Sequence, residues 1–375
     1  MTEYRQALAG EESEILDFAN MVFSMMDKPT DFRKLYPAVY GSNNFADFHL
    51  IAKDQERLIA TVAVKPLQLK LFGQLALSCG YLGTVCTHPF EQGKGHMRKL
   101  LDMAVVQSRK QGLELLALSG QRQRYNHYDF ENAGPIIAYC VNSSNLKSLF
   151  KEHQYTFQPL EYQESSVLDN LYAAYENLSM IGQRSKQLFK AYLAAWQGSC
   201  FVLLRNERAI GYIYSIGENI LEMAIEDPSQ TLQILYDWMD FKICKNFDIR
   251  VPAHCKDSIR MLGEAAESYL VSDSMMIHIF NWQSVIEKLL IFKSQFTYLL
   301  DGDAVIEITG EARLRIIVQS NRVTVKPTQK KVDAAFGHRE GITRFFSAQG
   351  IMQEKNDVFY SWFPLMLSIP AADSF

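Results

Sequence analysis

The sequence lacks the features of a membrane or secreted protein. No apolar run approaches the roughly 20 residues that a membrane-spanning helix needs. The first residues, Met1-Thr2-Glu3-Tyr4, are polar and acidic, whereas a signal peptide begins with basic and then apolar residues. We therefore expect a soluble, cytoplasmic protein with no membrane partner.

Cysteine is scarce, with 6 residues in a chain of 375. These cysteines form no Cys-x-x-Cys pair, and no histidines cluster with them at metal-ligand spacing. The sequence therefore predicts no metal site and no disulfide framework, and the thiols are those of a reduced cytoplasmic protein.

An excess of positive charge is also missing, because the net charge is −4 and the sequence pI is about 6.1. Proteins that grip nucleic acid without regard to sequence use basic patches to displace counterions. The charge balance thus argues against a nucleic-acid partner, and a small cationic molecule fits it better.

The length and the apolar content bound the number of domains. A single domain typically takes roughly 100–200 residues, and this chain has 375, of which 48% are hydrophobic. That content is enough for several cores, so two or three domains are expected.

The most informative segment covers residues 83–101, which read as a strand, a glycine loop and an amphipathic helix. The apolar stripe of this helix consists of Met97, Leu100, Leu101, Ala104 and Val105. The first amides of a helix have no partner inside it and carry partial positive charge. Gly93 and Gly95 allow close approach of a ligand to the backbone. The turn at residues 92–96 therefore suits an anion such as a pyrophosphate.

Three phosphate-loop patterns compete for this turn. A nucleoside-triphosphate loop needs Ser or Thr after Gly93-Lys94, where Gly95 stands, and a dinucleotide fingerprint needs glycine at Arg98. The remaining pattern is Gln/Arg-x-x-Gly-x-Gly/Ala, which Gln92 and Gly95 match, and Met97 matches imperfectly. On these residues the segment resembles the GNAT superfamily of acyl-CoA-dependent N-acetyltransferases. The resemblance implies that acetyl-CoA is bound by Gln92, Gly93, Lys94, Gly95, His96 and Met97.

A second segment adds to the resemblance. After an apparent strand at residues 113–118, Tyr125, Tyr128 and Phe130 match the superfamily pattern Tyr-x-x-Phe-Gly-Phe/Tyr, with Asp129 at the glycine position. Transfer of acetyl from sulfur expels a thiolate, and a phenol can protonate that sulfur. Tyr125 is thus the candidate general acid, and the alternative is a half-buried packing tyrosine.

The strand at residues 82–87 precedes the glycine loop. In the superfamily a backbone N–H of this strand, beside a bulge, polarises the thioester carbonyl, which places Val85, Cys86 and Thr87 at the cofactor. Such a donor contributes roughly 3 kcal/mol in oxyanion holes. Cys86 could instead be a nucleophile, but an isolated cysteine is more often a small buried hydrophobe, and the nearest base, His88, ends the strand.

The order of expected elements divides the chain into three domains. The first, residues 1–145, is the catalytic acetyltransferase domain, with helices at 11–26 and 31–36 and strands at 48–52, 58–64, 67–72 after a kink at Pro66, 82–87, 113–118 and 136–141. This order is that of a complete acetyltransferase domain.

Residues 146–272 repeat part of this plan without the phosphate loop. We expect a hairpin around Asn206-Glu207, then a strand at 221–225, a helix at 230–242 and a strand at 249–251. Before the helix stands Glu226-Asp227-Pro228-Ser229, whose carboxylates would repel a pyrophosphate. We interpret this part as a degenerate GNAT-like domain that cannot hold the cofactor.

Residues 273–375 show a third pattern. It comprises a helix at 283–290, strands at 304–308, 314–318 and 322–325, a helix at 339–348 and an apolar tail, and it looks like a sterol-carrier-like α+β domain. The predicted fold class is therefore mixed α+β and α/β, with tandem GNAT-like domains followed by a sterol-carrier-like domain.

This domain order resembles the enhanced intracellular survival (Eis) family of N-acetyltransferases over nearly the whole chain. The resemblance implies a homo-oligomer, specifically a hexamer, and an aminoglycoside- or polyamine-like amine as acceptor. It also implies that the terminal carboxylate, here on Phe375, lies in the active site as base or charge anchor. An α-carboxylate has a pKa of about 3.5, which desolvation raises. Chain termini are otherwise mostly frayed, and the alternative bases are Asp373, Glu131 and His127.

Acceptor contacts are expected from the N-terminal helices, which cover the cleft in the superfamily. A carboxylate with aromatic faces suits an ammonium, which selects Asp27, Phe23, Phe32 and Tyr36. The alternative is that this methionine-rich segment only packs in the core.

These inferences predict direct transfer of acetyl from acetyl-CoA to an amine in a ternary complex. The alternative is a binding or scaffold protein whose C-terminal domain holds an apolar ligand. Met97 and Asp129, which depart from the superfamily pattern, keep this alternative open.

Overall fold

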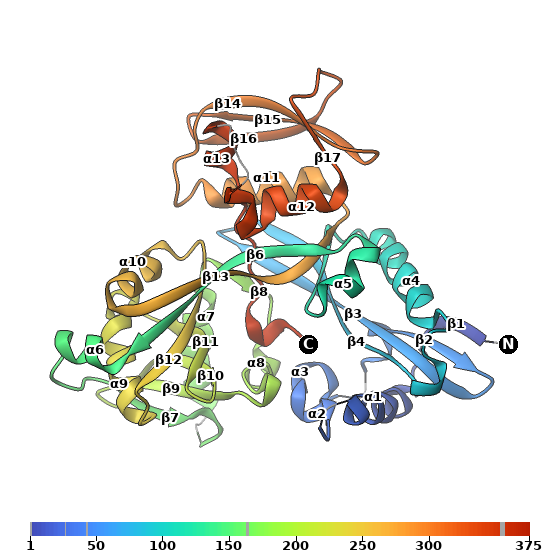
Figure 1. Ribbon diagram of the computed structural model, residues 1–375. Coiled ribbons are helices and arrows are strands. Elements are labelled where there is room, and N and C mark those ends of the chain that lie inside the picture. The colour runs from blue at the N-terminus through green and yellow to red at the C-terminus, as the bar shows by residue number, and fades with distance from the viewer. Residues whose placement is uncertain (1, 27, 43, 163–164, 353–356) are drawn as a thin grey trace.

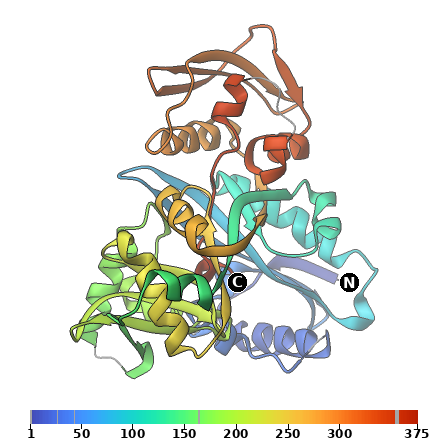
Figure 2. The same ribbon diagram turned by 60° about the vertical axis from the view of Figure 1, so that its left-hand side comes forward.

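The computed structural model describes residues 2–26, 28–42, 44–162, 165–352 and 357–375. Figure 1 shows two halves of one large sheet side by side and a third body above them, and the rotated view in Figure 2 shows the same arrangement. No helix in these ranges is long and apolar enough to cross a membrane.

The N-terminal half contains a twisted, mainly antiparallel set of strands. They are β1 (Thr2–Gln6), β2 (His49–Asp54), β3 (Arg57–Leu71), β4 (Ala76–Thr87), β5 (Leu115–Leu118) and β6 (Glu131–Asn142). Strands β1 to β5 follow one another in the sheet, with β4 and β5 parallel and the earlier pairs antiparallel. The first strand was not expected from the sequence, since only five residues form it.

Helices cover both faces of this half. They are α1 (Glu12–Met26), α2 (Phe32–Leu35), α3 (Pro37–Tyr40), α4 (His96–Lys110) and α5 (Arg122–Tyr125). Side chains alternate across a strand, so Leu50 and Ala52 of β2 pack in the cluster that contains α4, and Ile51 packs in the cluster that contains α1. The expected helices at 11–26 and in the segment after Met97 thus form, on opposite faces.

The sequence predicts a kink at Pro66 between two strands, but the structure has one continuous strand there. β3 runs unbroken from Arg57 to Leu71, and Pro66 lies opposite Gly80 of β4. The pairing of β3 with β2 ends at Ala63. At Pro66 the strand therefore has no β2 partner on that side, and the missing N–H of proline breaks no hydrogen bond to β2. Proline is tolerated at such positions because no ladder hydrogen bond is lost.

The two halves share strands instead of meeting at a linker. β13 (Ala266–Ile279) lies between β5 and β6, and Met276 pairs with Leu118. The expected domain boundary at residue 273 therefore falls inside this strand, and residues 273–279 belong to the large sheet. The carboxylate of Asp273 in this strand accepts hydrogen bonds from Ser347 Oγ at 2.5 Å and the Ala348 N–H at 2.8 Å.

The other strands of the sheet form the second half, and helices pack around them. The strands are β7 (Thr156–Pro159), β9 (Ser199–Arg205), β10 (Arg208–Ile216), β11 (Asn219–Ile225) and β12 (Asn246–Pro252), whereas β8 (Met180–Gly182) pairs with β3 of the first half. The helices are α6 (Ser143–Leu149), α7 (Ser165–Glu176), α8 (Phe189–Tyr192), α9 (Thr231–Phe241) and α10 (Lys256–Ala265). The expected hairpin is β9–β10, and both Asn206 and Glu207 take positive φ at its turn.

The third body is a small sheet with helices. It contains α11 (Trp282–Lys293), β14 (Gly302–Ile308), β15 (Ala312–Gln319), β16 (Arg322–Pro327), β17 (Ala334–Phe336), α12 (His338–Phe346) and α13 (Asp357–Trp362). The strand order is β16-β15-β14-β17. Buried aromatic residues fill the space between sheet and helices, among them Trp282, Phe336, Phe345, Trp362 and Phe363.

The chain then leaves this body and returns to the large sheet, ending between its two halves (Figure 1). The first part of the tail is fixed by Lys293 of α11, whose ammonium donates to the carbonyls of Trp362 at 3.1 Å and Pro364 at 3.3 Å. Burial lowers the pKa of Lys293 to about 8, because a charged ammonium is costly away from water.

This lysine makes stability depend on pH. An unfolded lysine has a pKa near 10.4, so between pH 8 and 10.4 the unfolded chain binds more protons, and the lysine's contribution to the free energy of unfolding rises by up to about 3 kcal/mol. The advantage of the wild type over Lys293→Met should grow with pH over this range. Urea unfolding of both proteins at pH 7.5 and pH 10 measures it, and contributions common to both proteins cancel. A difference that stays constant with pH would contradict the neutralisation of Lys293.

Candidate active site

The site begins at a bulge in β4. Thr61 of β3 pairs with Cys86, and Ala63 pairs with Gly83, so Thr84 and Val85 together oppose the single residue Val62. Thr84 has a φ of 47°, which is unusual for a β-branched residue and costs of order 1–3 kcal/mol. A bulge of this kind re-aims backbone groups at the point where pairing is broken.

A chain of buried hydrogen bonds holds the bulge. The hydroxyl of Thr61 donates to the Leu50 carbonyl, so it accepts from His49 Nδ1 at 2.9 Å. His49 Nε2 then accepts from Tyr40 at 3.2 Å, and the Tyr40 oxygen accepts from Thr84 at 2.6 Å. Burial lowers the pKa of His49 to about 3. With both ring nitrogens engaged and no charge at neutral pH, His49 orients Thr84 and is not a free base.

Strands β4 and β5 separate next to the bulge. Their parallel pairing covers only Cys79 to Tyr81 on β4 and Leu115 to Ala117 on β5. β4 continues to Thr87 without β5 beside it. The backbone of residues 82–87, which includes Val85, Cys86 and Thr87, therefore has an edge that can accept an extended ligand.

Cys86 is not suited to act as a nucleophile. Its side chain is buried, and burial raises the pKa of the Cys86 thiol well above its usual range. A thiolate is the reactive form, so the thiol is inert here, and only the backbone at this position is available to a ligand.

The glycine loop follows the strand through η2 (Pro89–Glu91). Gln92, Gly93, Lys94 and Gly95 are exposed, and α4 begins at His96. Gly95 is the N-cap with a φ of 85°, a left-handed conformation that most residues avoid. The free first-turn amides therefore face a turn that an anion can reach. Met97 is half-buried and packs in the cluster under α4.

Charged side chains surround this turn. Lys94 Nζ lies 2.9 Å and Arg57 Nη2 lies 3.0 Å from the carboxylate of Glu91. The Lys94 hydrogen bond is the main reason why the pKa of Glu91 is lowered. His96 is buried, and its Nδ1 lies 2.6 Å from the hydroxyl of Tyr4. Two cations thus stand at the turn, and Lys94, which is more than half exposed, can turn from Glu91 to a bound phosphate.

Tyr125 ends α5 on the same face of the sheet as α4. It is 6% exposed and packs in one cluster with Leu82, Leu118 and Phe130. Burial raises the pKa of Tyr125, and Arg124 opposes the rise. Asp129, at the superfamily's glycine position, adopts a φ of 59°. Aspartate is one of the few residues that tolerate this conformation, so the departure from the pattern preserves the turn.

The chain terminus lies against the bulged strand from the other face. A Cβ at position 83 would lie 2.4 Å from a carboxylate oxygen of Phe375 and 3.0 Å from its carboxyl carbon, so only glycine leaves room for them. The ring of Phe375 is buried, with its centroid 6.1 Å from Tyr36, 6.4 Å from Tyr40 and 5.8 Å from Tyr81. The terminus is therefore packed and not frayed.

The expected acceptor residues lead to this terminus. Phe23 packs edge-on against Phe32 at 4.9 Å, and Phe32 lies 5.6 Å from Tyr36. Tyr36 then contacts Phe375. Asp27 lies outside the described residues. The structure thus brings the three aromatic candidates to Phe375, while Tyr125 stands on the opposite face, next to the place where β4 and β5 separate.

Phe23, Phe32, Tyr36 and Phe375 form an aromatic wall, and Trp196, which also belongs to it, was missed because it comes from the second half. The Trp196 ring lies 4.8 Å from Tyr36, and its Nε1 donates to Ser374 Oγ at 3.1 Å. Tyr192 accepts from Lys65 Nζ at 3.0 Å. The aromatic residues of segment 189–196 were the available signal, but nothing in the sequence joins them to the N-terminal helices.

Two of the three alternative bases are engaged in ion pairs, and the third lies on the surface. Asp373 is buried and paired with Arg184 at 3.0 Å. Glu131 is held by Arg122; although burial raises the pKa of Glu131, the Arg122 hydrogen bonds lower it further. His127 is exposed on the surface.

The second half has no comparable loop at the corresponding helix. Before α9, the side chain of Asp227 accepts from the Ser229 N–H at 3.0 Å, and Glu226 pairs with Arg208 at 2.7 Å. Carboxylates therefore occupy the place where phosphates would meet the helix.

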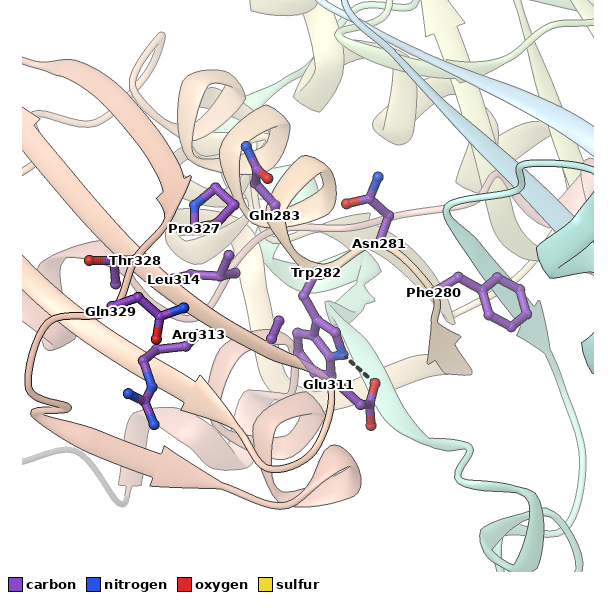
Figure 3. A pocket seen from close by; sticks show the side chains of 11 residues that line it. Phe280, Asn281, Trp282, Gln283, Glu311, Arg313, Leu314, Pro327, Thr328 and Gln329 are labelled. Atoms are coloured by element: carbon purple, nitrogen blue, oxygen red, sulfur yellow. Dashed lines mark hydrogen bonds between the residues drawn. The ribbon is translucent and has the colours of Figure 1, made fainter.

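A cavity of about 350 Å³ lies in the third body, away from this site (Figure 3). Polar and apolar side chains share its lining, and Trp282 Nε1 donates to Glu311 at 3.1 Å. Its lining residues are Phe280, Asn281, Trp282, Gln283, Glu311, Ala312, Arg313, Leu314, Pro327, Thr328 and Gln329.

Comparison with known proteins agrees with the geometry. Residues 3–133 match the family described as an acetyltransferase (GNAT) domain. No curated protein matches the sequence. Among solved structures, a GCN5-related N-acetyltransferase from Kribbella flavida is similar at 13% identity with a TM-score of 0.69, and a probable N-acyltransferase from Enterococcus faecalis at 15% identity with 0.70; each match covers 100% of both chains.

Eis1 from Mycobacterium abscessus is similar over 100% of both chains as well, at 14% identity and a TM-score of 0.68. At such identities the likeness is one of fold. Residues 3–133 are a GNAT acetyltransferase domain, and the chain is an acyltransferase with an Eis-like architecture.

Proposed function

We propose that this acyltransferase is an acetyl-CoA-dependent N-acetyltransferase that transfers acetyl directly to an amine in a ternary complex. Acetyl-CoA supplies the acetyl group as a thioester. The observation that carries the proposal is the terminal carboxylate of Phe375, which lies against Gly83 beside the bulge of β4. A buried anion at that point serves an ammonium acceptor and its proton.

The residues of the glycine loop fit a nucleotide diphosphate. The amides of His96 and Met97 open α4, and Gly93 and Gly95 leave the approach clear. Lys94 adds a cation that can pair with phosphate. The N–H groups of residues 85–87, at the separated edge of β4, supply donors for a thioester carbonyl, where developing negative charge needs them.

Two groups of the chain move protons in this proposal. The Phe375 carboxylate accepts the proton of the amine, directly or through a water molecule, from the face that carries Tyr36. The Tyr125 hydroxyl donates a proton to the leaving sulfur from the other face. Because burial raises the pKa of Tyr125, its hydroxyl keeps the proton at neutral pH until the thiolate forms.

The acceptor is a small cationic amine of the aminoglycoside or polyamine kind. Phe32, Tyr36 and Trp196 offer aromatic faces and edges around the terminus, and aromatic faces attract ammonium groups. Asp27 and Phe23 are further proposed contacts. Trp196, which is 38% exposed, lies where these aromatic residues meet solvent.

The remaining features complete the proposal. The second half is a GNAT-like domain that lacks cofactor binding, as its acidic turn at Glu226 and Asp227 supports, and the third body is sterol-carrier-like.

We also propose a cytoplasmic homo-oligomer, a hexamer by resemblance to the Eis family. Three consecutive exposed apolar residues of β13, Tyr269, Leu270 and Val271, support a contact between copies.

The alternative function, a scaffold with an apolar ligand in the third body, finds less support. The cavity there is lined by polar and apolar side chains in similar number (Figure 3), and the space between sheet and helices is filled by buried aromatic residues. An apolar ligand needs a predominantly apolar pocket.

Binding of CoA separates the two functions. At about a hundredfold its dissociation constant a ligand raises the free energy of unfolding by about 2.7 kcal/mol, so CoA should raise the melting temperature. Gly95→Asp should abolish the rise, because aspartate tolerates the left-handed N-cap and puts a carboxylate where the diphosphate would lie.

Gly217→Asp is the matched control. Gly217 also has positive φ, at 62°, with open space around it, and it lies in the β10–β11 turn. This variant should keep the full response to CoA. Absence of any shift in the wild type, or an equal shift in Gly95→Asp, would favour the scaffold.

A further inference from the structure

Arg184 forms a buried ion cluster with the C-terminal tail. Its side chain is fully buried between two carboxylates, Glu222 of β11 and Asp373. Nη1 and Nη2 donate to Glu222 at 2.8 and 2.7 Å, while Nε and Nη2 donate to Asp373 at 3.0 and 3.1 Å. A guanidinium that grips two carboxylates in this forked manner fixes both in distance and in orientation.

The surroundings of the cluster are shaped for Asp373. The guanidinium carbon lies 4.2 Å from the centroid of the Tyr175 ring, and Tyr212 donates to Glu222 at 2.6 Å. At Gly182 a Cβ would lie 2.5 Å from Asp373 Oδ2, so only glycine leaves room for the carboxylate. Burial of charged groups is costly unless they are paired and hydrogen-bonded, and here each partner is.

Asp373 is two residues from the terminal carboxylate. Between them, Ser374 accepts the Trp196 indole N–H at 3.1 Å, and Phe375 lies on Gly83. Arg184, which holds Asp373, and Trp196, which donates to Ser374, lie outside the GNAT domain. Gly83 belongs to that domain, as does Tyr81, which also hydrogen-bonds Ser374. Arg184 and Trp196 therefore tether the two residues that precede Phe375, whose own ring packs on aromatic residues of the GNAT domain.

We propose that Arg184 is a positioning residue for acetyl transfer, and that the second half of the chain acts as a clamp that sets the terminal carboxylate beside the bulge of β4. This inference rests on the proposed function, in which that carboxylate takes the proton of the amine. Glu222 acts with it by fixing the guanidinium. In this proposal the second half, which lacks a phosphate loop, contributes to the reaction by positioning the terminal carboxylate.

The test variant is Asp373→Ala, because it removes the tether but leaves Arg184 paired with Glu222 and creates no unpaired buried charge. A misplaced catalytic group can cost on the order of 10²-fold in rate, so we expect kcat to fall by about 10- to 100-fold. KM for acetyl-CoA and the thermal shift with CoA should not change, since the glycine loop is untouched. A merely structural defect would alter these as well.

A second measurement reports how firmly the C-terminal residues are held and does not depend on enzyme activity. A carboxypeptidase that removes aromatic terminal residues should release Phe375 slowly from the wild type and at least about tenfold faster from Asp373→Ala, because the enzyme needs a freed terminus. Mass spectrometry follows the loss of one phenylalanine. The triple variant Arg184→Met, Glu222→Gln, Asp373→Asn, which carries no buried charge, should behave like Asp373→Ala.

Arg208→Gln is the control, since Arg208 pairs with Glu226 on the surface of the same half and should keep both rates. Unchanged release and unchanged kcat in Asp373→Ala would overturn the clamp. Faster release with unchanged kcat would keep the tether but remove the carboxylate from the reaction, and so would reject the proposed function instead.

Discussion

Extension of the chain by one glycine after Phe375 should lower kcat by about 10²-fold or more. The added residue turns the Phe375 carboxylate into a peptide group and moves the terminal charge by roughly 3.5 Å. General-base catalysis contributes typically 10²–10⁴-fold, and the added residue would disturb the close approach of the Phe375 carboxyl group to Gly83. Steady-state kinetics with a polyamine and an aminoglycoside as acceptors measure the loss.

The control for the extension is Phe375→Leu. It keeps the carboxylate in place and replaces the aromatic ring that packs among Tyr36, Tyr40 and Tyr81, so kcat should stay within a few-fold of the wild type. If the extended chain turns over as fast as the wild type, another group accepts the proton. If both variants lose activity equally, the packing of the ring matters and the charge does not.

The helices and turns that depend on residues close together in the chain could be predicted from the sequence, because local residue patterns determine them. The apolar period of the segment after Met97 predicts α4, which buries Leu100, Leu101 and Ala104. The glycines at 93 and 95 mark a turn, and both take positive φ. The Asn206-Glu207 turn likewise predicts its hairpin.

Pairings between distant segments were not readable. β13 inserts between β5 and β6 from a position more than a hundred residues downstream. The partner of its Asp273 side chain, Ser347, is another 74 residues along the chain. The same holds for Arg184. An arginine amid polar and apolar neighbours has no local pattern, and its two carboxylate partners are 38 and 189 residues away.

The residues of the candidate site likewise fall into those that a local sequence pattern predicts and those that only the fold brings together. The glycine loop and Tyr125 belong to patterns of consecutive residues, whereas the aromatic wall joins Tyr36 to Trp196 across the two halves. The bulge at Thr84 depends on the buried chain through Tyr40 and His49. The superfamily resemblance implies a bulge in this strand, but Tyr40 and His49, which hold it, are brought together only by the fold.

Tyr125→Phe should lower kcat by about 10²-fold while the CoA-induced thermal shift stays as in the wild type. The change removes one hydroxyl, and the buried ring keeps its packing against Phe130. Without a proton donor the expelled thiolate leaves unprotonated, and general-acid catalysis contributes typically 10²–10⁴-fold. A donor that acts only as the thiolate forms changes kcat without changing the affinity for CoA.

Tyr128→Phe is the matched control, because Tyr128 lies three residues on, is half-buried, and also has its pKa raised by burial. Its substitution should leave kcat nearly unchanged. If Tyr125→Phe and Tyr128→Phe lose activity equally, the hydroxyl of Tyr125 has no special role. An acyl donor whose leaving thiolate is already a weak base, such as the acetyl thioester of an aryl thiol, should need no proton, so the defect of Tyr125→Phe should shrink with it. A defect that is the same for both donors would show that Tyr125 acts on the fold of the site instead of on the sulfur.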